Sequence, residues 1–209
     1  MKKFLIYCFF FFGFIFLFIN LTVGEALIGI GALVFIITIV ERKAEVLDNW
    51  SVLIKNAQGQ KEMIVSTTKE LLGKSKAPSL EIKEDQVGPG LTSVLTGETR
   101  DFLIVTDRRS IKLSNFKVYI NASDYGDNLF VSWYLTYLPA VWQVFLSLLP
   151  GARQAMNLDD LNLFNKQDLT AYITNAHHCL LEAVDKLMLE MNQDPSKIDR
   201  KSKGFLGIS

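Results

Sequence analysis

The sequence predicts an α+β membrane protein, in which an N-terminal two-helix transmembrane hairpin precedes a small antiparallel β-meander domain flanked by helices. Three observations lead to this fold class. Residues 4–40 are almost free of charge, three strand-like segments follow one another in the middle of the chain, and residues 169–191 carry an apolar stripe at helical spacing. We therefore expect three parts: the hairpin over residues 1–41, a cytoplasmic α+β domain over 42–193, and a basic and apolar tail over 194–209.

The first part is too long for one membrane span and long enough for two short ones. Glu25 is the only charged residue between positions 4 and 40. A helix rises about 1.5 Å per residue and the hydrocarbon core of a bilayer is about 30 Å thick, so one span takes about 20 residues. A polar break at 20–25, which holds an amide, a glycine and this carboxylate, divides the stretch into expected spans at 4–19 and 26–40.

Positive charges at both ends of this stretch predict its orientation. Lys2 and Lys3 precede the first span, and Arg42 and Lys43 follow the second. Because flanking cations favour the cytoplasmic side, a hairpin satisfies both pairs at once, and both termini of this integral membrane protein are expected in the cytoplasm. The alternative is a cleavable signal peptide that ends at 22–24, which would leave the second span as an anchor.

Small residues lie along the expected second span. Gly24, Gly29 and Gly31 would allow the first span to approach closely, although glycine is also more frequent in membrane helices in general. Close packing of the two helices is therefore one interpretation of these glycines.

Alternating segments and turn residues organise the region after the hairpin. A helix is expected from Gln60 to Gly73, where the glycine ends it. Strands are expected at 50–54, 80–82, 101–106, 115–121 and 128–137. The Gly-Pro-Gly sequence at 88–90 marks a turn, and a glycine-containing loop at 123–127 suits a hairpin. Short connections favour antiparallel neighbours, so the last three strands are expected to form the meander.

The stretch at 129–152 contains no charged residue and has three interpretations. Its first part alternates like a strand, and a separate apolar helix is expected at 139–149. This helix is too short to cross a bilayer, so Trp142, Phe145 and Leu149 would lie in the domain core, at the membrane interface or against a partner. A third transmembrane span is the remaining alternative, and it would carry the C-terminal segment across the membrane.

The C-terminal helix has the clearest pattern in the domain. Asp168 is the expected N-cap of a helix over 169–191. Its apolar stripe comprises Leu169, Tyr172, Ile173, Ala176, Leu180, Val184, Leu187 and Met191. Cys179 borders the stripe and is interpreted as a small buried hydrophobic residue.

The tail combines cations with apolar residues. Lys201, Lys203 and Phe205 are expected to contact anionic lipid headgroups or a partner, and each cation near a membrane surface contributes about 1 kcal/mol. The alternative is a solvated, flexible terminus.

Two residues of the C-terminal helix are candidate metal ligands. His178 and Glu182 are four positions apart, with Asp185 nearby, so their side chains could reach one ion. This arrangement supplies at most three ligands and no second cluster completes it. A solvated face with an ion pair between Glu182 and Lys186 is therefore the preferred interpretation, and no cofactor is expected.

Composition and missing motifs exclude several classes of function. Lys and Arg together number 22, as do Asp and Glu, so the chain lacks the basic excess of a nucleic-acid binder. The sequence holds no phosphate-binding glycine loop and no nucleophile elbow. The two cysteines, Cys8 and Cys179, do not indicate a disulfide framework.

These observations favour a membrane-anchored, non-catalytic accessory or scaffold protein. Its cytoplasmic domain would bind a protein partner, or another copy of the chain, at the membrane surface. The alternative is a membrane-bound enzyme that acts on lipid or uses a metal near His178 and Glu182. A pore or transport component is a third hypothesis, although two spans with one carboxylate supply few polar groups to line a pathway.

Overall fold

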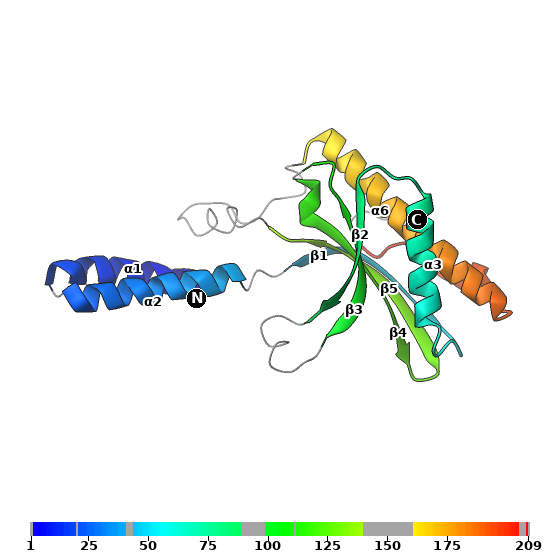
Figure 1. Cartoon of the computed structure of the whole chain (residues 1–209), viewed down its shortest axis with the longest axis horizontal. Coiled ribbons are helices and arrows are strands. Elements are labelled where there is room, and N and C mark those ends of the chain that lie inside the picture. The colour runs from blue at the N-terminus through cyan, green and yellow to red at the C-terminus, as the bar shows by residue number, and fades with distance from the viewer. Residues whose placement is uncertain are drawn as a thin grey trace. The chain divides into compact units, whose positions relative to one another are not determined.

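A computed structural model of the chain is shown in Figure 1, and it describes residues 2–19, 21–40, 44–88, 99–110, 112–139, 161–204 and 208. The described residues divide into two compact units, an N-terminal helical hairpin and an α+β unit that begins at Ala44. The expected helix at 139–149 lies outside the described residues, apart from Pro139, and so do Trp142, Phe145 and Leu149.

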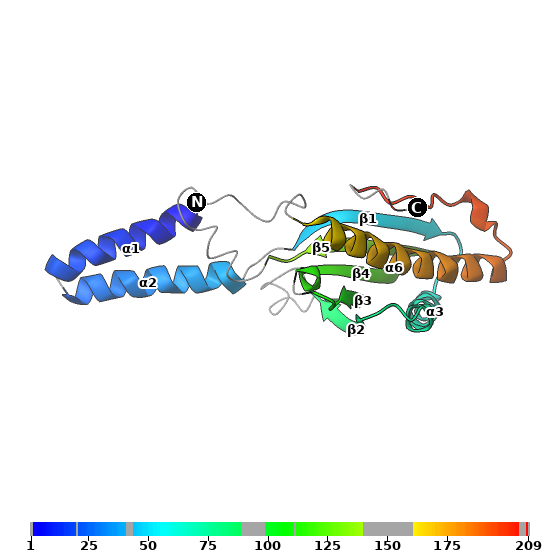
Figure 2. The same ribbon diagram turned by 90° about the horizontal axis from the view of Figure 1, so that it is seen from above.

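The hairpin consists of α1 (Lys2–Ile19) and α2 (Leu21–Val40), which lie side by side (Figures 1 and 2). Because α2 begins at Leu21, the predicted break is wrong over residues 21–25, which are helical. Gly24 lies within this part of the helix and against Leu17 of α1. Close packing there offsets the cost of a glycine in a helix, which is about 1 kcal/mol relative to alanine.

Glycines set the closeness of the two helices. A Cβ atom added at Gly24 would lie 2.6 Å from the Leu17 nitrogen, and one at Gly31 would lie 3.2 Å from the Phe9 Cβ. The interpretation of a close helix contact therefore holds for these two glycines. Gly29 has no neighbour within 4 Å of such an atom.

The contact also uses a glycine of α1 that the sequence analysis did not single out. A Cβ atom at Gly13 would lie 2.9 Å from the Ile28 Cγ1 of α2. Glycines thus contribute to the contact from both helices, which brings their backbones close together.

Large apolar side chains cover much of the outside of the hairpin. They include Phe10, Phe11, Phe12, Phe14, Ile15, Leu21, Val23 and Ile30, all of which are exposed. None of the helices in the described ranges combines the length and the hydropathy that a bilayer crossing requires. The predicted hairpin is present, but its transmembrane character is unsupported.

The α+β unit is built on one antiparallel sheet of five strands in the order β1-β5-β4-β3-β2. Its strands are β1 (Glu45–Ile54), β2 (Leu80–Val87), β3 (Arg100–Asp107), β4 (Phe116–Tyr125) and β5 (Asn128–Tyr137). The predicted meander is confirmed and includes β2 as a fourth member. The first strand closes the other edge, where Trp50 lies opposite Trp133 of β5.

The expected strand segments are confirmed with one exception. Asn115 ends a 3₁₀ helix, η1 (Leu113–Asn115), so β4 begins one residue later than predicted. The β4–β5 turn has Gly126 at a φ of +60°, a conformation that suits glycine.

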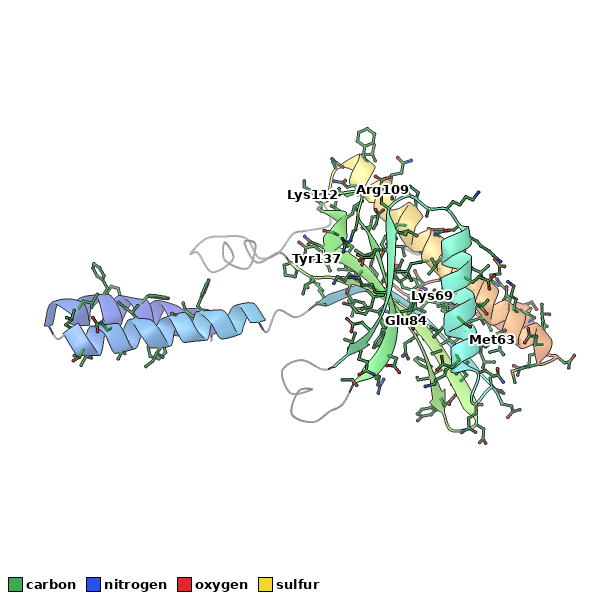
Figure 3. The ribbon with its side chains drawn as sticks, in the orientation of Figure 1. Met63, Lys69, Glu84, Arg109, Lys112 and Tyr137 are labelled. Carbon is green, nitrogen blue, oxygen red and sulfur yellow. The ribbon has the colours of Figure 1, made fainter. Side chains whose placement is uncertain are left out.

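Both long helices cover the same face of the sheet. The ring of His177 on α6 (Leu163–Glu190) accepts a hydrogen bond from Trp133 of β5. On α3 (Lys61–Lys74), Lys69 pairs with Glu84 of β2 at 2.6 Å (Figure 3). No helix in the described ranges covers the opposite face, where Ile104 is half-buried.

The helix predicted from Gln60 to Gly73 is confirmed with a shift of one residue at each end. Gln60 is the N-cap, and Gly73 lies inside the last turn of α3. Gly73 does not end the helix, because the backbone of Ser75 is still helical and the Ser75 N–H donates a hydrogen bond to the Leu71 carbonyl.

The C-terminal helix begins earlier than predicted. Asn162 is its N-cap, and the amide oxygen of that side chain accepts a hydrogen bond from the Asn165 N–H at 2.8 Å. The prediction of Asp168 as N-cap is therefore wrong. This carboxylate lies within the helix and accepts a hydrogen bond from Arg109 at 3.0 Å, which holds α6 against the loop after β3.

The predicted apolar stripe of α6 forms the core with the covered face of the sheet. Its buried members are Leu169, Tyr172, Ile173, Ala176, Leu180, Val184 and Leu187, and Cys179 is buried beside them as predicted. From the sheet, Trp50, Trp133 and Ile120 are fully buried against this layer.

Candidate functional site

A tyrosine hydroxyl is inserted between the backbones of β3 and β4. At the pair formed by Val105 and Val118, the Tyr172 hydroxyl accepts a hydrogen bond from the Val118 N–H at 3.0 Å and donates one to the Val105 carbonyl at 2.6 Å. Burial raises the pKa of this phenol, so the hydroxyl stays protonated and able to donate. The ladder between the strands ends shortly afterwards, at Leu103 and Ile120.

Beyond this point the sheet divides into two ribbons, as the separating ends of β3 and β4 show in Figure 1. β3 remains paired with β2 as far as Arg100, and β4 remains paired with β5 as far as Tyr125. The Asn121 side-chain amide donates a hydrogen bond across the fork to the Asp101 carbonyl at 2.7 Å.

The fork contains a cavity of about 1110 Å³, here called the fork groove. Residues of α3 and of both ribbons line it, together with Leu53 of β1. Apolar side chains contribute much of the lining, among them Leu53, Val65, Phe102 and Phe130. The volume lies at the upper end of the range for small-molecule sites, so the groove has room for several residues of a bound chain.

Carboxylates predominate among the charged groups of the fork groove. The acidic residues are Glu62, Glu84, Asp85, Asp101 and Asp124, against the cations Lys61 and Arg100. Of these acids, Glu84 pairs with Lys69, and Asp124 accepts a hydrogen bond from the Gly59 N–H at 2.9 Å. The groove therefore presents a net negative charge beside an apolar surface.

A smaller cavity of about 500 Å³ lies over the open face of β2, β3 and β4. Its charged groups largely neutralise one another, because Glu81 pairs with Lys83 at 3.0 Å and also with Arg108. The hydrogen bond from Lys83 is the main reason why the pKa of Glu81 lies below its usual value. This cavity offers less apolar surface than the fork groove.

The charged turn at Asp107, Arg108 and Arg109 is a structural element. The Asp107 carboxylate is fully buried and accepts a hydrogen bond from the Arg109 Nε at 2.7 Å. The same guanidinium donates a hydrogen bond to Asp168 of α6 (Figure 3). The hydrogen bond to Asp107 raises the pKa of Arg109. The turn therefore fastens α6 to the sheet.

A buried histidine links α6 to two tryptophans of the sheet. The Trp133 indole N–H donates to the His177 Nδ1 at 2.8 Å, and the His177 Nε2 lies 2.8 Å from the Arg200 carbonyl. The ring of Trp50 packs edge-on against the same imidazole. Because Nδ1 accepts and Nε2 faces a carbonyl, the ring is neutral with its proton on Nε2, and burial lowers its pKa.

The segment that follows α6 is held against β1. The Asp48 carboxylate accepts hydrogen bonds from the Ser202 hydroxyl at 3.0 Å and the Gly204 N–H at 2.8 Å. The Lys203 N–H donates to the Asn49 carbonyl at 2.8 Å, and the Trp50 indole donates to the Asp199 carbonyl at 2.6 Å. These bonds order the tail as far as Gly204, and a flexible terminus does not describe this part of it.

The predicted contact residues of the tail lie in two situations. The side chains of Lys201 and Lys203 are exposed, as contact with lipid or a partner would require. Phe205 lies outside the described residues.

The candidate metal ligands on α6 do not converge on a common site. His178 is exposed, Glu182 pairs with Lys186 at 3.1 Å as expected, and Asp185 pairs with Arg200 at 2.8 Å. Over the part of the chain that the structure describes, no three His, Cys, Asp or Glu side chains are grouped to hold a metal ion.

Sequence reasoning missed the fork groove and His177. The acids of the groove come from separate elements, and only the strand register and the insertion of Tyr172 bring them together. The one available signal was the hydroxyl of Tyr172 within an otherwise apolar stripe, because a buried hydroxyl usually has a hydrogen-bond partner.

No protein-family model, curated protein or solved structure shows a significant match to this chain.

Proposed function

We propose that this protein is a membrane-anchored, non-catalytic accessory or scaffold protein whose α+β unit binds a protein partner at the membrane surface. The observation that carries this proposal is the fork groove, where a cavity with apolar lining and excess negative charge opens between the two ribbons of the sheet.

Membrane anchoring is supported by the surface of the hairpin. The exposed side chains there are mainly aromatic and aliphatic, and Glu25 is the only charged residue between positions 4 and 40. Exposure of such a surface to water is unfavourable by about 25 cal/mol for each Å² of apolar area. The glycine contacts hold the two helices together and leave this surface outward, so a lipid phase would stabilise the pair.

The lengths of the two helices are consistent with an anchor that reaches deep into one or both leaflets. α1 has 18 residues and α2 has 20. At 1.5 Å per residue these correspond to about 27 and 30 Å, close to the hydrocarbon thickness of a thin bilayer. The cations at 2–3 and 42–43 would then lie with the headgroups on the cytoplasmic side, together with the α+β unit.

Partner binding, rather than catalysis, is supported by the chemistry of the groove. It is lined by carboxylates and apolar groups, with no histidine or cysteine among the lining residues. The enzyme alternative would use His178 and Glu182, but the latter is engaged by Lys186 and neither residue lines the groove.

The test is the mass of the assembly that the full chain forms in its native membrane. We expect extraction with several mild detergents, followed by mass measurement, to recover the chain in a complex larger than its own detergent-bound monomer. A monomer in every detergent would contradict the proposal of a scaffold.

A further inference from the structure

We infer that the fork groove binds an extended segment of a partner protein, which adds to β4 as a new strand and alternates basic with apolar side chains. This inference rests on the proposed function, because it specifies the chemistry of the protein partner. It follows from three features of the groove: a strand edge that pairs with no other strand of the described ranges, a face rich in carboxylates and a face rich in large apolar groups.

The free edge belongs to β4. The N–H of Val118 points toward β3 and donates a hydrogen bond to the Tyr172 hydroxyl. In a strand, every second residue directs its N–H and C=O to the same side, so Ala122 and Asp124 direct theirs into the groove. Within the described residues, no strand pairs with this side of β4 beyond Ile120.

The opposite wall is less available for strand addition. The Asp101 carbonyl of β3 points into the fork, but the Asn121 side-chain amide already donates to it. Because this hydrogen bond bridges the fork at Asn121, an extended chain would form its backbone hydrogen bonds with β4 beyond that residue, as in other cases where a peptide adds to an exposed sheet edge.

Strand alternation separates the groove into two chemically distinct faces. Successive side chains point to opposite faces of a sheet. On β3 and β4, Asp101 and Asp124 share the face that α3 covers, because they alternate in step with the buried Val105 and Ile120. Glu84 of β2 belongs to the same face, as its contact with Lys69 of α3 shows.

The helix-covered face of the groove therefore carries most of the negative charge. It holds Asp101, Asp124 and Glu84, and α3 adds Glu62, against Lys61 as the one lining cation of this face. Basic side chains at alternate positions of an added strand would face these carboxylates.

The open face of the groove carries three large apolar side chains, the neutral polar residues Asn121 and Ser123, and no net charge. Phe102 of β3, Phe130 of β5 and Leu53 of β1 line it, and Phe130 lies opposite Leu53 in the sheet register. Its two charged groups, Asp85 and Arg100, have opposite signs. The remaining positions of the added strand would therefore carry apolar side chains, and the ligand would alternate in the sequence basic, apolar, basic, apolar.

The experiment uses the full chain in micelles of an uncharged detergent and a fluorescent peptide of alternating Lys and Val residues. Fluorescence anisotropy measures binding of this peptide, of a Glu and Val peptide with the same alternation, and of a Lys and Val peptide with its lysines in one block. We expect saturable binding of the alternating basic peptide, weaker binding of the block peptide and none of the acidic peptide. Equal binding of the acidic peptide would overturn the inference.

Charge is tested by a double substitution, Glu62→Gln with Asp101→Asn. Two exposed ion pairs contribute about 1 kcal/mol together, so we expect affinity for the alternating basic peptide to fall about fivefold. The matched control is Glu182→Gln with Glu190→Gln, which removes the same charge from the exposed side of α6. Equal losses in the two double variants would show that only net charge matters and would overturn the assignment to the groove.

Strand addition is tested on the peptide, so that the fold of the protein is unchanged. N-methylation of alternate residues on one edge removes the donors that β4 would bind, whereas methylation of the other edge leaves them intact. We expect only one of the two methylated peptides to lose binding. Equal binding of both would contradict strand addition, and release of the unmodified peptide by micromolar Ca²⁺ would assign the carboxylates to a cation instead.

The two proposals fail in different ways. A large assembly in mild detergent, together with no peptide binding, would reject the basic segment and retain the scaffold function. A monomer in detergent that binds the alternating peptide would support the groove and reject the stable assembly.

Discussion

In the α+β unit, Trp50 and Trp133 are each 1% exposed, whereas in the hairpin Phe11 and Phe14 are 65% and 62% exposed. The first unit buries most of its large apolar side chains by placing α6 across the sheet, although Leu163 and Phe164 at the start of α6 are exposed. The second unit uses glycines for its internal contact and leaves Phe10, Phe11, Phe12 and Phe14 on the outside. The comparison indicates that the α+β unit is stabilised by its own core, whereas the proposed lipid environment would be needed to cover the exposed side chains of the hairpin.

The largest expected effect is the loss of an aromatic side chain from the core. Trp133→Ala should lower the free energy of unfolding of the α+β unit by about 3–5 kcal/mol, because it leaves a cavity. It also removes the donor to His177 Nδ1. Denaturant unfolding followed by circular dichroism in detergent measures this change. Phe11→Ala in the hairpin is the matched comparison, and a similar loss in both variants would invalidate the contrast between the units.

The hairpin is expected to be sensitive at its glycines. Gly24→Ala places a Cβ atom 2.6 Å from the Leu17 nitrogen, so α1 and α2 must move apart. Overpacking of this kind costs about 1–3 kcal/mol, and we expect faster amide hydrogen exchange in α1 by mass spectrometry.

Gly29→Ala provides the control for that substitution. It introduces the same methyl group on the same helix, at a position where no described atom beyond the adjacent backbone of α2 lies within 4 Å. Unchanged exchange is expected, and equal acceleration in both glycine variants would show that the close contact does not hold the hairpin.

The hydroxyl of Tyr172 separates the paired half of the β3–β4 contact from the forked half. Tyr172→Phe removes the bridge between the Val118 N–H and the Val105 carbonyl and leaves both groups buried. A buried group without its hydrogen bond costs about 1–3 kcal/mol, so the thermal midpoint of the α+β unit should fall. An unchanged midpoint would indicate that the two strands close on each other without the hydroxyl.

The smallest effect concerns the charge of His177. Burial holds the pKa of this imidazole below its ordinary value of 6.5. Between the lowered pKa of the folded state and a pH of 6.5, the unfolded chain binds the proton more readily than the folded chain does. The stability contribution of His177 is therefore complete above pH 6.5 and decreases as the pH falls through this window. The slope is at most about 1.4 kcal/mol per pH unit.

This pH dependence distinguishes the buried imidazole from the exposed one. Unfolding curves measured between neutral and mildly acid pH should lose part of their pH dependence in His177→Gln. His178→Gln should retain it, because that side chain is exposed. Identical pH profiles in both variants would contradict the neutral state inferred for His177.

Periodicity predicted the elements of the α+β unit well and their ends less well. The strand at 128–137 and the stripe of α6 repeat at spacings that packing against one layer imposes. The start of α6 was misplaced because Asn162 and Asp168 are both favourable caps, and only the tertiary contact of Asp168 with Arg109 decides between them.

The candidate site was beyond the reach of local patterns. The fork groove depends on where the ladder between β3 and β4 ends and on the hydroxyl of Tyr172, which lies 54 residues after Val118 in the chain. His177 was missed for a similar reason, since its partners Trp133 and Arg200 lie on other elements. Charge counts identified the balance of the whole chain but not the local excess of carboxylates.

The most direct test of the contrast between the two units is an alkaline carbonate wash of membranes that contain the full chain. We expect the chain to remain in the membrane pellet with its α+β unit folded, because in the proposed arrangement the exposed aromatic surface of α1 and α2 would lie in lipid. Complete recovery in the supernatant as a folded, detergent-free species would contradict this claim, since the hairpin would then be stable in water.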